Sequence, residues 1–408
     1  MTDARRLRIG FVYDGLYPYT RGGAERRYHE LAVRLAERYE VHRFSWRYRP
    51  DQEAGQPGLV HHPVGPAEAF YGSDGRRTIR EAASFAGRLV PSLLRHRVDV
   101  LDCSATPYVP LYGCALAARL TGTPLIVTWH EWWGDYWAAY LADRPLAGQL
   151  GQWCEAGCRG LGDIRVAVSD LTARALAGSG PSGADGRPVR VVGNGAPIEA
   201  VAAASPGAER FDVAFVGRLI RDKQVDLLLE ALAIVARARP AVRCAIIGEG
   251  PEREQLEALA GSLGLANVVR FLGGLDEAGC FGVLKASRTL ALLSAREGYG
   301  IAVVEAQAAG AVPIVARGPL TAAPELVRDG VDGIVCDPTP DAAAAAIERV
   351  LAEPDVAARL SLAAREAAVG RDWDRAALAM EDIYLEAIAR RVGRRRDAER
   401  VELDAGLG

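Results

Sequence analysis

Hydrophobic residues along the chain follow two alternating spacings. Short apolar runs of strand length are followed by longer stretches in which apolar residues recur every three or four positions, the spacing of one helix face. The run LRIGFVYD at residues 7–14 is an example of the first, and Leu31, Leu35 and Tyr39 are an example of the second. The pattern therefore predicts a strand and then a helix from the start of the chain.

The same alternation continues through the first half. Residues 47–75 interrupt it, because they are rich in proline, glycine and polar residues, and we expect an irregular excursion there. Residues 196–210 interrupt it again and are expected to be a linker. After the first strand, the predicted strands of this half are 39–46, 98–104, 124–130, 164–170 and 189–195, with helices that include 76–96 and 109–121.

A second set of strands and helices begins after the expected linker. Near-continuous apolar strands that alternate with helices indicate parallel sheets covered on both faces, so two such sets predict two doubly wound α/β domains. Ligands of such sheets bind outside the carboxyl ends of the strands, and we expect the site in a cleft that the two domains face. The predicted strands of the second set are 211–219, 242–248, 267–273, 289–295, 312–317 and 333–338.

The C-terminal stretch 373–391 has the spacing of one more amphipathic helix, and the polar tail after it is expected to be frayed. Its arginines allow peripheral contact with an anionic membrane, although the acidic residues among them dilute that charge. In RDWDR, Asp372 and Asp374 could hold a divalent cation, but they stand where a helix should start and are more simply capping residues.

Composition narrows the class of protein. The 408 residues are enough for two or three domains, and a net charge of −3 argues against a general affinity for nucleic acid. No apolar run approaches the length of a transmembrane helix and no signal peptide is recognisable, so a cytoplasmic protein is expected. The seven cysteines have no framework spacing, and Cys154 and Cys158 lack two further metal ligands nearby.

Lysine is almost absent. Of the 49 lysines and arginines, only Lys223 and Lys285 are lysines. A lysine kept in so arginine-rich a chain is informative, because a planar guanidinium does not replace a compact ammonium at every site.

The segment FVGRLIRDK carries the first candidate chemistry. A strand ends at Gly217, and Arg218 and Lys223 follow at the turn and the helix start. Two cations that converge at the carboxyl end of a strand would clamp a diphosphate. The alternative is that both are surface charges, although cations at a helix start oppose the helix dipole.

The segment EGYGIAVVEAQAAG carries two glutamates, Glu297 and Glu305. They could be a general acid/base pair, two ligands of one bound group, or two surface charges. Glu297 is expected on the loop after a strand and Glu305 about one turn into the following helix, which Gly310 should stop. Gly298 and Gly300 would let the backbone pass close to a ligand.

Two segments of the first half face the same expected cleft. Gly22 and Gly23 stand at a helix start, where bare N–H groups can meet a phosphate, although a tight turn explains them equally well. TWHEWWGDYW follows a strand and is rich in tryptophan, whose flat apolar rings often contact sugars. The candidate acceptor residues in it are His130, Glu131, Trp132 and Trp133.

Together these motifs resemble the retaining glycosyltransferases of family 4, which have the GT-B fold of two Rossmann-like domains. The resemblance covers nearly the whole chain, and its most specific part is the E-x7-E motif from Glu297 to Glu305. It implies transfer of a sugar from a nucleotide-diphosphate donor with retention of anomeric configuration and generally without a bound metal. Residues 1–195 would bind the acceptor, 196–370 the donor, and 371–408 would be a helix returning to the first domain, with its tail.

The resemblance also implies individual roles. Arg218 and Lys223 would neutralise the donor diphosphate, Glu305 would bind the ribose, Glu297 would hold the transferred sugar, and His130 would lie near the reacting sugar. Arg218, Lys223, Glu297 and His130 are thus the expected catalytic residues. The expected donor-binding set is Gly22, Gly23, Gly217, Arg218, Lys223, Leu272, Glu297, Gly298, Tyr299, Gly300, Ile301 and Glu305.

The identities of donor and acceptor stay open at this point. UDP- and GDP-linked sugars are both compatible with the motifs, as are small-molecule, glycan and lipid-linked acceptors. Two other readings share the architecture: a nucleotide-sugar binding protein without turnover, and a GT-B glycoside phosphorylase or epimerase. A pyridoxal-phosphate phosphorylase would need a Schiff-base lysine, for which only Lys223 and Lys285 are available.

Overall fold

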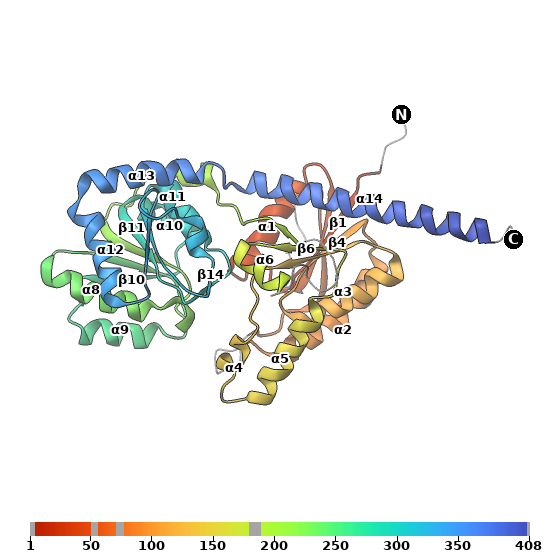
Figure 1. The fold of residues 1–408 in the computed structure, drawn as a ribbon, viewed down its shortest axis with the longest axis horizontal. Coiled ribbons are helices and arrows are strands. Elements are labelled where there is room, and N and C mark those ends of the chain that lie inside the picture. The colour runs from red at the N-terminus through yellow and green to blue at the C-terminus, as the bar shows by residue number, and fades with distance from the viewer. Residues whose placement is uncertain (1–4, 50–55, 71–76, 179–188, 406–408) are drawn as a thin grey trace. The chain divides into compact units, whose positions relative to one another are not determined.

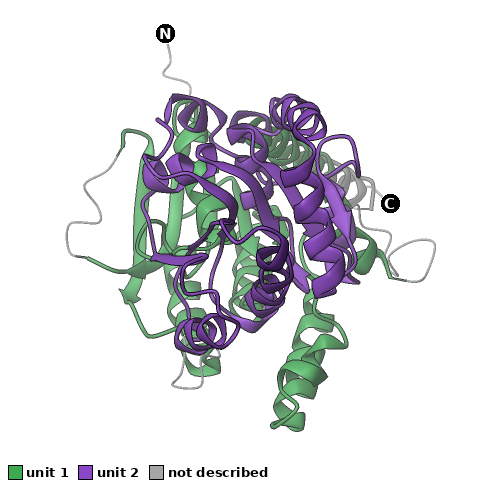
Figure 2. Ribbon diagram, turned by 90° about the vertical axis from the view of Figure 1, so that its left-hand side faces the viewer, with its two compact units in different colours: residues 1–168, 172–192, 376–408 green, residues 169–171, 193–375 purple. Residues whose placement is uncertain are grey.

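The computed structural model describes residues 5–49, 56–70, 77–178 and 189–405. The chain divides into two compact units, shown in different colours in Figure 2. Unit 1 comprises residues 1–168, 172–192 and 376–408, and unit 2 comprises residues 169–171 and 193–375. Each unit is built around one parallel sheet with helices on its faces (Figure 1).

The sheet of unit 1 has the strand order β3-β2-β1-β4-β5-β6-β7, and every neighbouring pair is parallel. Its central strands are buried along their whole length, as expected for a sheet covered on both faces. The strands are β1 (Arg8–Val12), β2 (Glu40–Arg47), β3 (Leu59–Pro66), β4 (Val100–Ser104), β5 (Leu125–Trp129), β6 (Ile164–Ala167) and β7 (Val189–Val191).

The helices of unit 1 connect these strands in chain order, except that the long C-terminal helix α14 returns from the end of unit 2. Apart from α14, they are α1 (Gly23–Leu35), α2 (Ile79–Arg95), α3 (Tyr108–Thr121), α4 (Tyr136–Tyr140), α5 (Pro145–Cys158) and α6 (Asp170–Ala177), and α14 is Trp373–Ala405.

Unit 2 repeats the plan with the parallel order β10-β9-β8-β11-β13-β15 and a separate two-stranded sheet, β12-β14. Its strands are β8 (Phe211–Val216), β9 (Cys244–Ile247), β10 (Val269–Gly273), β11 (Ser287–Leu292), β12 (Arg296–Glu297), β13 (Val312–Ala316), β14 (Leu320–Thr321) and β15 (Ile334–Cys336). Its α-helices are α7 (Ile198–Ala203), α8 (Val225–Ala238), α9 (Arg253–Ser262), α10 (Glu277–Lys285), α11 (Ile301–Ala309), α12 (Pro340–Ala352) and α13 (Pro354–Ala368), with 3-10 turns at Arg221–Lys223 and Ala323–Leu326.

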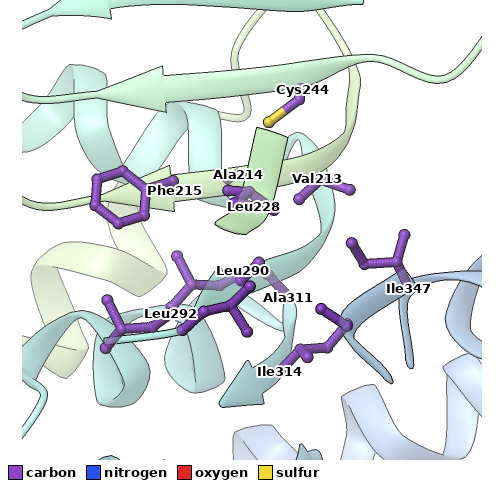
Figure 3. Packing of buried hydrophobic residues seen from close by; sticks show 14 of the residues in the cluster. Val213, Ala214, Phe215, Leu228, Cys244, Leu290, Leu292, Ala311, Ile314 and Ile347 are labelled. Carbon is purple, nitrogen blue, oxygen red and sulfur yellow. The ribbon is translucent and has the colours of Figure 1, made fainter. Parts of the chain in front are cut away.

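The core of unit 2 explains why these runs form strands. Figure 3 shows side chains of β8, β9, β11 and β13 packed with Leu228 of α8 and Ile347 of α12. The side chains of Leu228 and Ile347 are at most 1% exposed. Burying one such side chain contributes roughly 1.5–3 kcal/mol, so the apolar runs favour the sheet over any exposed alternative. The predicted fold class, two doubly wound parallel-sheet units, is confirmed.

The prediction of an irregular excursion was wrong for residues 59–66. These residues form β3, which pairs with β2 in parallel from Leu59 to Pro66. The prolines Pro63 and Pro66 made the segment look like a loop. β3 lies at the edge of the sheet, where a strand needs a partner on one side only and a missing N–H is tolerated.

Two further expectations need correction. The expected linker contains the helix α7, whose Val201 is fully buried, and Lys285 Nζ donates to the carbonyls of Ala202 and Ala204 at 2.7 Å each. The expected frayed tail is instead a continuation of α14, which is helical to Ala405. In both cases the polar or small residues that suggested irregular chain are compatible with helix.

A buried carboxylate ties α14 to the sheet of unit 1. Asp102 on β4 accepts hydrogen bonds from Tyr28 of α1 at 3.0 Å, Thr128 of β5 at 2.8 Å and Tyr384 of α14 at 2.6 Å. Burial raises the pKa of Asp102, while the three hydroxyl donors partly lower it. Satisfying the charge in this way offsets the cost of burying it and fixes the position of α14.

A cluster of imidazoles lies beside β2, β3 and the end of α2. His62 Nε2 is 2.7 Å from His42 Nδ1, and its ring stacks on His96 with centroids 4.0 Å apart. Burial, followed by the neighbouring imidazoles, lowers the pKa of His62 to about 3. Burial and then Arg43 lower the pKa of His61 to about 4.

These shifts predict acid sensitivity of unit 1. Histidine in an unfolded chain has a pKa of about 6.5, so the unfolded state binds more protons below that pH and folding stability falls from about pH 6.5 toward pH 4. Denaturant unfolding at pH 7.5, 6.5, 5.5 and 5.0 should show this loss, and His62→Gln should make it shallower. An identical pH slope in the variant would show that this imidazole does not contribute.

Candidate active site

The loop after β8 is held close to the loop after β9. The Gly217 N–H donates to the Ile247 carbonyl at 3.0 Å, and the Leu219 N–H donates to the Glu249 carbonyl at 2.9 Å. Gly248 has a φ of +140°, and a Cβ added to it would overlap the Gly217 carbonyl oxygen. Glycine is therefore required there by both conformation and close backbone approach. The result is a fixed turn that leads to Arg218, whose side chain is exposed.

Lys223 ends the 3-10 turn Arg221–Lys223 that follows. The next residue, Gln224, has a φ of +48°, which is uncommon for a residue with a side chain, and α8 begins after it. The strained residue lies directly beside Lys223, so the path of the backbone at this lysine is set by the turn and not by the helix.

The loop after β11 is also ordered by backbone pairing. Glu297 was expected on the loop after a strand. Within that connection it lies in the short strand β12, which pairs with β14, and its carbonyl accepts from the Ala322 N–H at 2.7 Å. Gly300 has a φ of +106° and precedes α11. Gly310, with a φ of +82°, ends α11, as predicted.

Two ion pairs join these two loops. Lys223 Nζ contacts Glu297 Oε2 in a very short ion pair, and Arg296 NH2 lies 2.6 Å from Asp222 Oδ2. All four side chains are between 12% and 17% exposed. Residues 222 and 223 are neighbours in the chain, and so are residues 296 and 297. The two ion pairs therefore link the loops that follow β8 and β11, which are neighbouring strands of the sheet. We call these two ion pairs the clasp.

Other predicted donor residues of unit 2 lie on α11, just before it, and on β10. Glu305 lies on α11 and is 5% exposed, and Ile301 is the first residue of that helix. Tyr299 packs against Gly193, where an added Cβ would lie 2.9 Å from its ring. Leu272 lies on β10 at a β-bulge, beside the Gly273 carbonyl that accepts from Gly248 at 2.9 Å.

The predicted residues of unit 1 lie on two elements of that unit. Gly22 is the N-cap of α1 and Gly23 is its first residue. His130 directly follows β5, and its ring lies 6.2 Å from that of Tyr28 of α1. Burial, followed by the charge of Arg27, lowers the pKa of His130 to about 3. This imidazole is therefore neutral at neutral pH and suited to hydrogen bonding rather than to donating a proton as a cation.

The tryptophan-rich segment after His130 is folded around a buried carboxylate. Glu155 of α5 accepts from the Trp133 and Gly134 N–H groups at 2.8 Å each, from Tyr108 Oη at 2.6 Å and from Trp137 Nε1 at 3.2 Å. Burial raises the pKa of Glu155, while these donors partly lower it. Glu155 is thus a positioning residue for the segment.

Not all the tryptophans of this segment are in the same surroundings. Trp129 is fully buried and belongs to the core. Trp132 is partly exposed and packs on Trp129 and under the Arg159 guanidinium, 5.8 Å from its ring centre. Trp133 packs against Trp137, with centroids 4.7 Å apart. Core packing therefore explains Trp129 fully and the others in part.

Sequence reasoning missed three residues that build these sites. Asp222 and Arg296 stand next to predicted residues, but nothing in a single sequence indicates that segments 74 positions apart form an ion pair. Glu155 left a recognisable signal, since it is the only charged residue of α5. In contrast, the Asp372 cap was predicted and is confirmed, because Asp372 Oδ1 accepts from the Arg375 N–H at 2.7 Å.

Two doubly wound parallel-sheet units of this topology form the GT-B fold, which solved glycosyltransferase structures share. The family model described as "Glycosyl transferases group 1" matches residues 201–367, and that described as "Glycosyltransferase Family 4" matches residues 21–200. The chain belongs to this glycosyltransferase family and is an enzyme of that class.

Relatives of established name are also glycosyltransferases. A D-inositol 3-phosphate glycosyltransferase of Nocardiopsis dassonvillei is 30% identical over 87% of this chain and 87% of its own length. A protein of the same name from Streptomyces griseus is 35% identical over 43% of this chain and 39% of its own length. A glycogen synthase of Mycobacterium tuberculosis is 32% identical over 46% of this chain and 45% of its own length.

Solved structures share the fold at lower identity. Sucrose-phosphate synthase from Thermosynechococcus elongatus superposes with a TM-score of 0.78 at 19% identity, covering 94% of this chain and all of that one. Anabaena HepE in complex with UDP-glucose superposes with a TM-score of 0.72 at 19% identity, covering 93% of this chain and all of that one. At such identity these likenesses establish the fold alone.

The crowding at Gly248 leads to a direct test of how the β8 loop is held. Gly248→Ala should lower the free energy of unfolding by about 1–3 kcal/mol, because its φ is unfavourable for alanine and its Cβ would overlap backbone. Gly261→Ala is the matched control, since nothing lies within 4 Å of its added Cβ inside α9. It should be neutral or stabilising by about 0.4–1 kcal/mol. Equal stability of the two variants in denaturant unfolding would contradict the close-approach argument.

Proposed function

We propose that this protein is a retaining glycosyltransferase that moves a hexose from a nucleotide-diphosphate sugar to a hydroxyl acceptor without requiring a metal ion. The observation that carries the proposal is the clasp in unit 2, which brings Lys223 to Glu297 just before the N-terminus of α11. An ammonium, a carboxylate and the first turn of a helix thus lie near the carboxyl ends of β8 and β11, a combination suited to a sugar diphosphate.

The diphosphate end of the donor would be held by Arg218 and Lys223. Cleavage of a sugar–phosphate bond builds negative charge on the leaving diphosphate, and two cations at the phosphates would stabilise it as a metal ion would in other enzymes. In this proposal the N–H groups of Gly298, Gly300 and Ile301 add to the same field, because they precede or begin α11. Gly22 and Gly23 of unit 1 would supply further N–H groups.

The two glutamates would bind the rest of the donor rather than transfer a proton between them. Glu297 would hydrogen-bond the transferred sugar, and its ion pair with Lys223 orients both groups before the donor arrives. Glu305 would bind the ribose hydroxyls. Leu272 and Tyr299 would line the nucleoside and sugar portions.

A UDP-linked hexose is the first donor to test, because HepE of Anabaena, which shares the fold, was solved with UDP-glucose, and GDP-linked hexoses are the second. The acceptor would lie against unit 1, near His130, Glu131, Trp132 and Trp133. Two of the relatives reported above are named D-inositol 3-phosphate glycosyltransferase, so a phosphorylated polyol is the first acceptor to test, ahead of glycan and lipid-linked alcohols.

The test compares Lys223→Ala with Lys285→Ala, the substitution of the only other lysine. Lys223→Ala should reduce acceptor-dependent release of nucleoside diphosphate ~100- to 1,000-fold, because one transition-state contact is lost. Lys285→Ala should retain activity per folded molecule, since Lys285 bonds carbonyls near α7. Unchanged turnover in Lys223→Ala would refute the diphosphate clamp.

The same assay separates catalysis from binding alone. An active wild type should give a product with the donor's anomeric configuration, seen in the proton coupling of the anomeric centre, and should keep activity in the presence of EDTA. Donor binding without turnover on any of these acceptors would favour a nucleotide-sugar binding protein.

A further inference from the structure

Helix α5 of unit 1 exposes a surface without charge. Its only ionisable acid, Glu155, is buried in the hydrogen bonds described above. Leu146, Leu150 and Trp153 are 82%, 53% and 65% exposed. Their spacing of four and three residues puts them on one side of the helix. Large apolar side chains exposed in series are unusual on a soluble surface and mark a contact site.

A second apolar stripe adjoins the first. On α3, Tyr112, Leu116 and Leu120 follow one another at steps of four and are 41%, 51% and 63% exposed. The Tyr112 hydroxyl donates to the Cys154 carbonyl of α5 at 3.0 Å, so the two helices meet next to Trp153. Figure 1 shows α5 and α3 close to each other in unit 1. We call these six residues, Tyr112, Leu116, Leu120, Leu146, Leu150 and Trp153, the apolar face.

Helix α2 lies along α3 and adds positive charge beside the apolar face. A Cβ added to Gly113 of α3 would lie 3.0 Å from Val90 of α2, which places the two helices side by side. Every residue of α2, α3 and α5 is described, and within them only Glu81 and Glu155 are acidic, both at most 1% exposed. The exposed charges on these three helices are Arg80, Arg88, Arg95 and Arg119.

Few acidic side chains lie close enough to form ion pairs with these arginines. Arg88 lies 3.9 Å from Glu68 and over the ring of Trp46. Arg80, Arg95 and Arg119 form no ion pair with any residue in the described part of the chain. The exposed charges of α2 and α3 are thus all basic in a protein whose net charge is −3, whereas Asp135 and Asp143 lie beside α5. Aromatic and aliphatic side chains next to such basic charges are the composition that binds at the interface of an anionic bilayer.

We propose that the apolar face and its arginines bind the surface of a membrane that contains anionic lipids, with the protein lying on the bilayer. Among the described residues no helix is long and apolar enough to cross it, so the contact would be interfacial. A second copy of the chain fits this surface less well, because a two-fold contact would bring like-charged arginines together. The proposal does not depend on the donor or the acceptor of the enzyme.

The test is co-sedimentation with vesicles of phosphatidylcholine alone and with about one third phosphatidylglycerol. The wild-type protein should bind the anionic vesicles and bind less as salt is raised. Leu120→Glu combined with Leu150→Glu should lower the partition coefficient more than tenfold. Leu362→Glu on α13 is the matched control, since Leu362 and Leu120 are both 63% exposed, and it should bind like the wild type.

The electrostatic part is tested separately. Arg95→Gln and Arg119→Gln should each weaken binding to anionic vesicles about fivefold, the equivalent of ~1 kcal/mol per arginine near the surface. Circular dichroism and thermal unfolding confirm that each variant is folded. Failure of the wild type to bind, or equal loss in Leu362→Glu, would overturn the proposal. So would a concentration-dependent dimer that the double glutamate variant abolishes, together with absence of vesicle binding.

Discussion

The geometry of the candidate site depends on the ion pair between Lys223 and Glu297, supported by the neighbouring pair of Asp222 and Arg296. Each pair alone would add little, because ion pairs near the surface are typically worth about 0–1 kcal/mol. Their value lies in position. Both fix side chains at the ends of adjacent parallel strands, and the backbone on either side is fixed by the residues Gly248 and Gly300, whose φ angles suit glycine. The charges are thus arranged before any ligand arrives, which is the condition for electrostatic catalysis.

Unit 1 uses buried carboxylates for a different purpose. Asp102 collects three hydroxyl donors and joins α14 to the sheet, and Glu155 collects two N–H groups, a phenol and an indole to shape the segment after His130. Each acid is surrounded by donors because an unsatisfied buried carboxylate would cost several kcal/mol. Glu155 is the only charged residue of α5 and its carboxylate is buried, so the exposed side of this helix carries no charge. One residue therefore links the shape of the tryptophan segment to the apolar face.

The sequence was most informative where a single run of residues decides the outcome. Apolar runs and helical spacing located both sheets, and Gly310 and Asp372 marked helix ends through local geometry. Prediction failed where contacts with another part of the chain decide which structure a segment adopts. Residues 59–66 become a strand because β2 offers an open edge, and α7 forms because Val201 has a core to enter. The motif from Glu297 to Glu305 was recognisable, but its pairing with Lys223 joins segments 74 residues apart and needs the fold.

The central claim is that Lys223 meets the diphosphate of a nucleotide-sugar donor. The chain contains only two lysines, so protein labelled with ¹³C-lysine should give two ε-methylene signals in an NMR spectrum. Titration with UDP or GDP should shift the Lys223 signal, assigned by its absence in Lys223→Ala, and leave that of Lys285 unchanged. Saturable nucleotide binding, measured by calorimetry, that leaves the Lys223 signal in place would contradict the account.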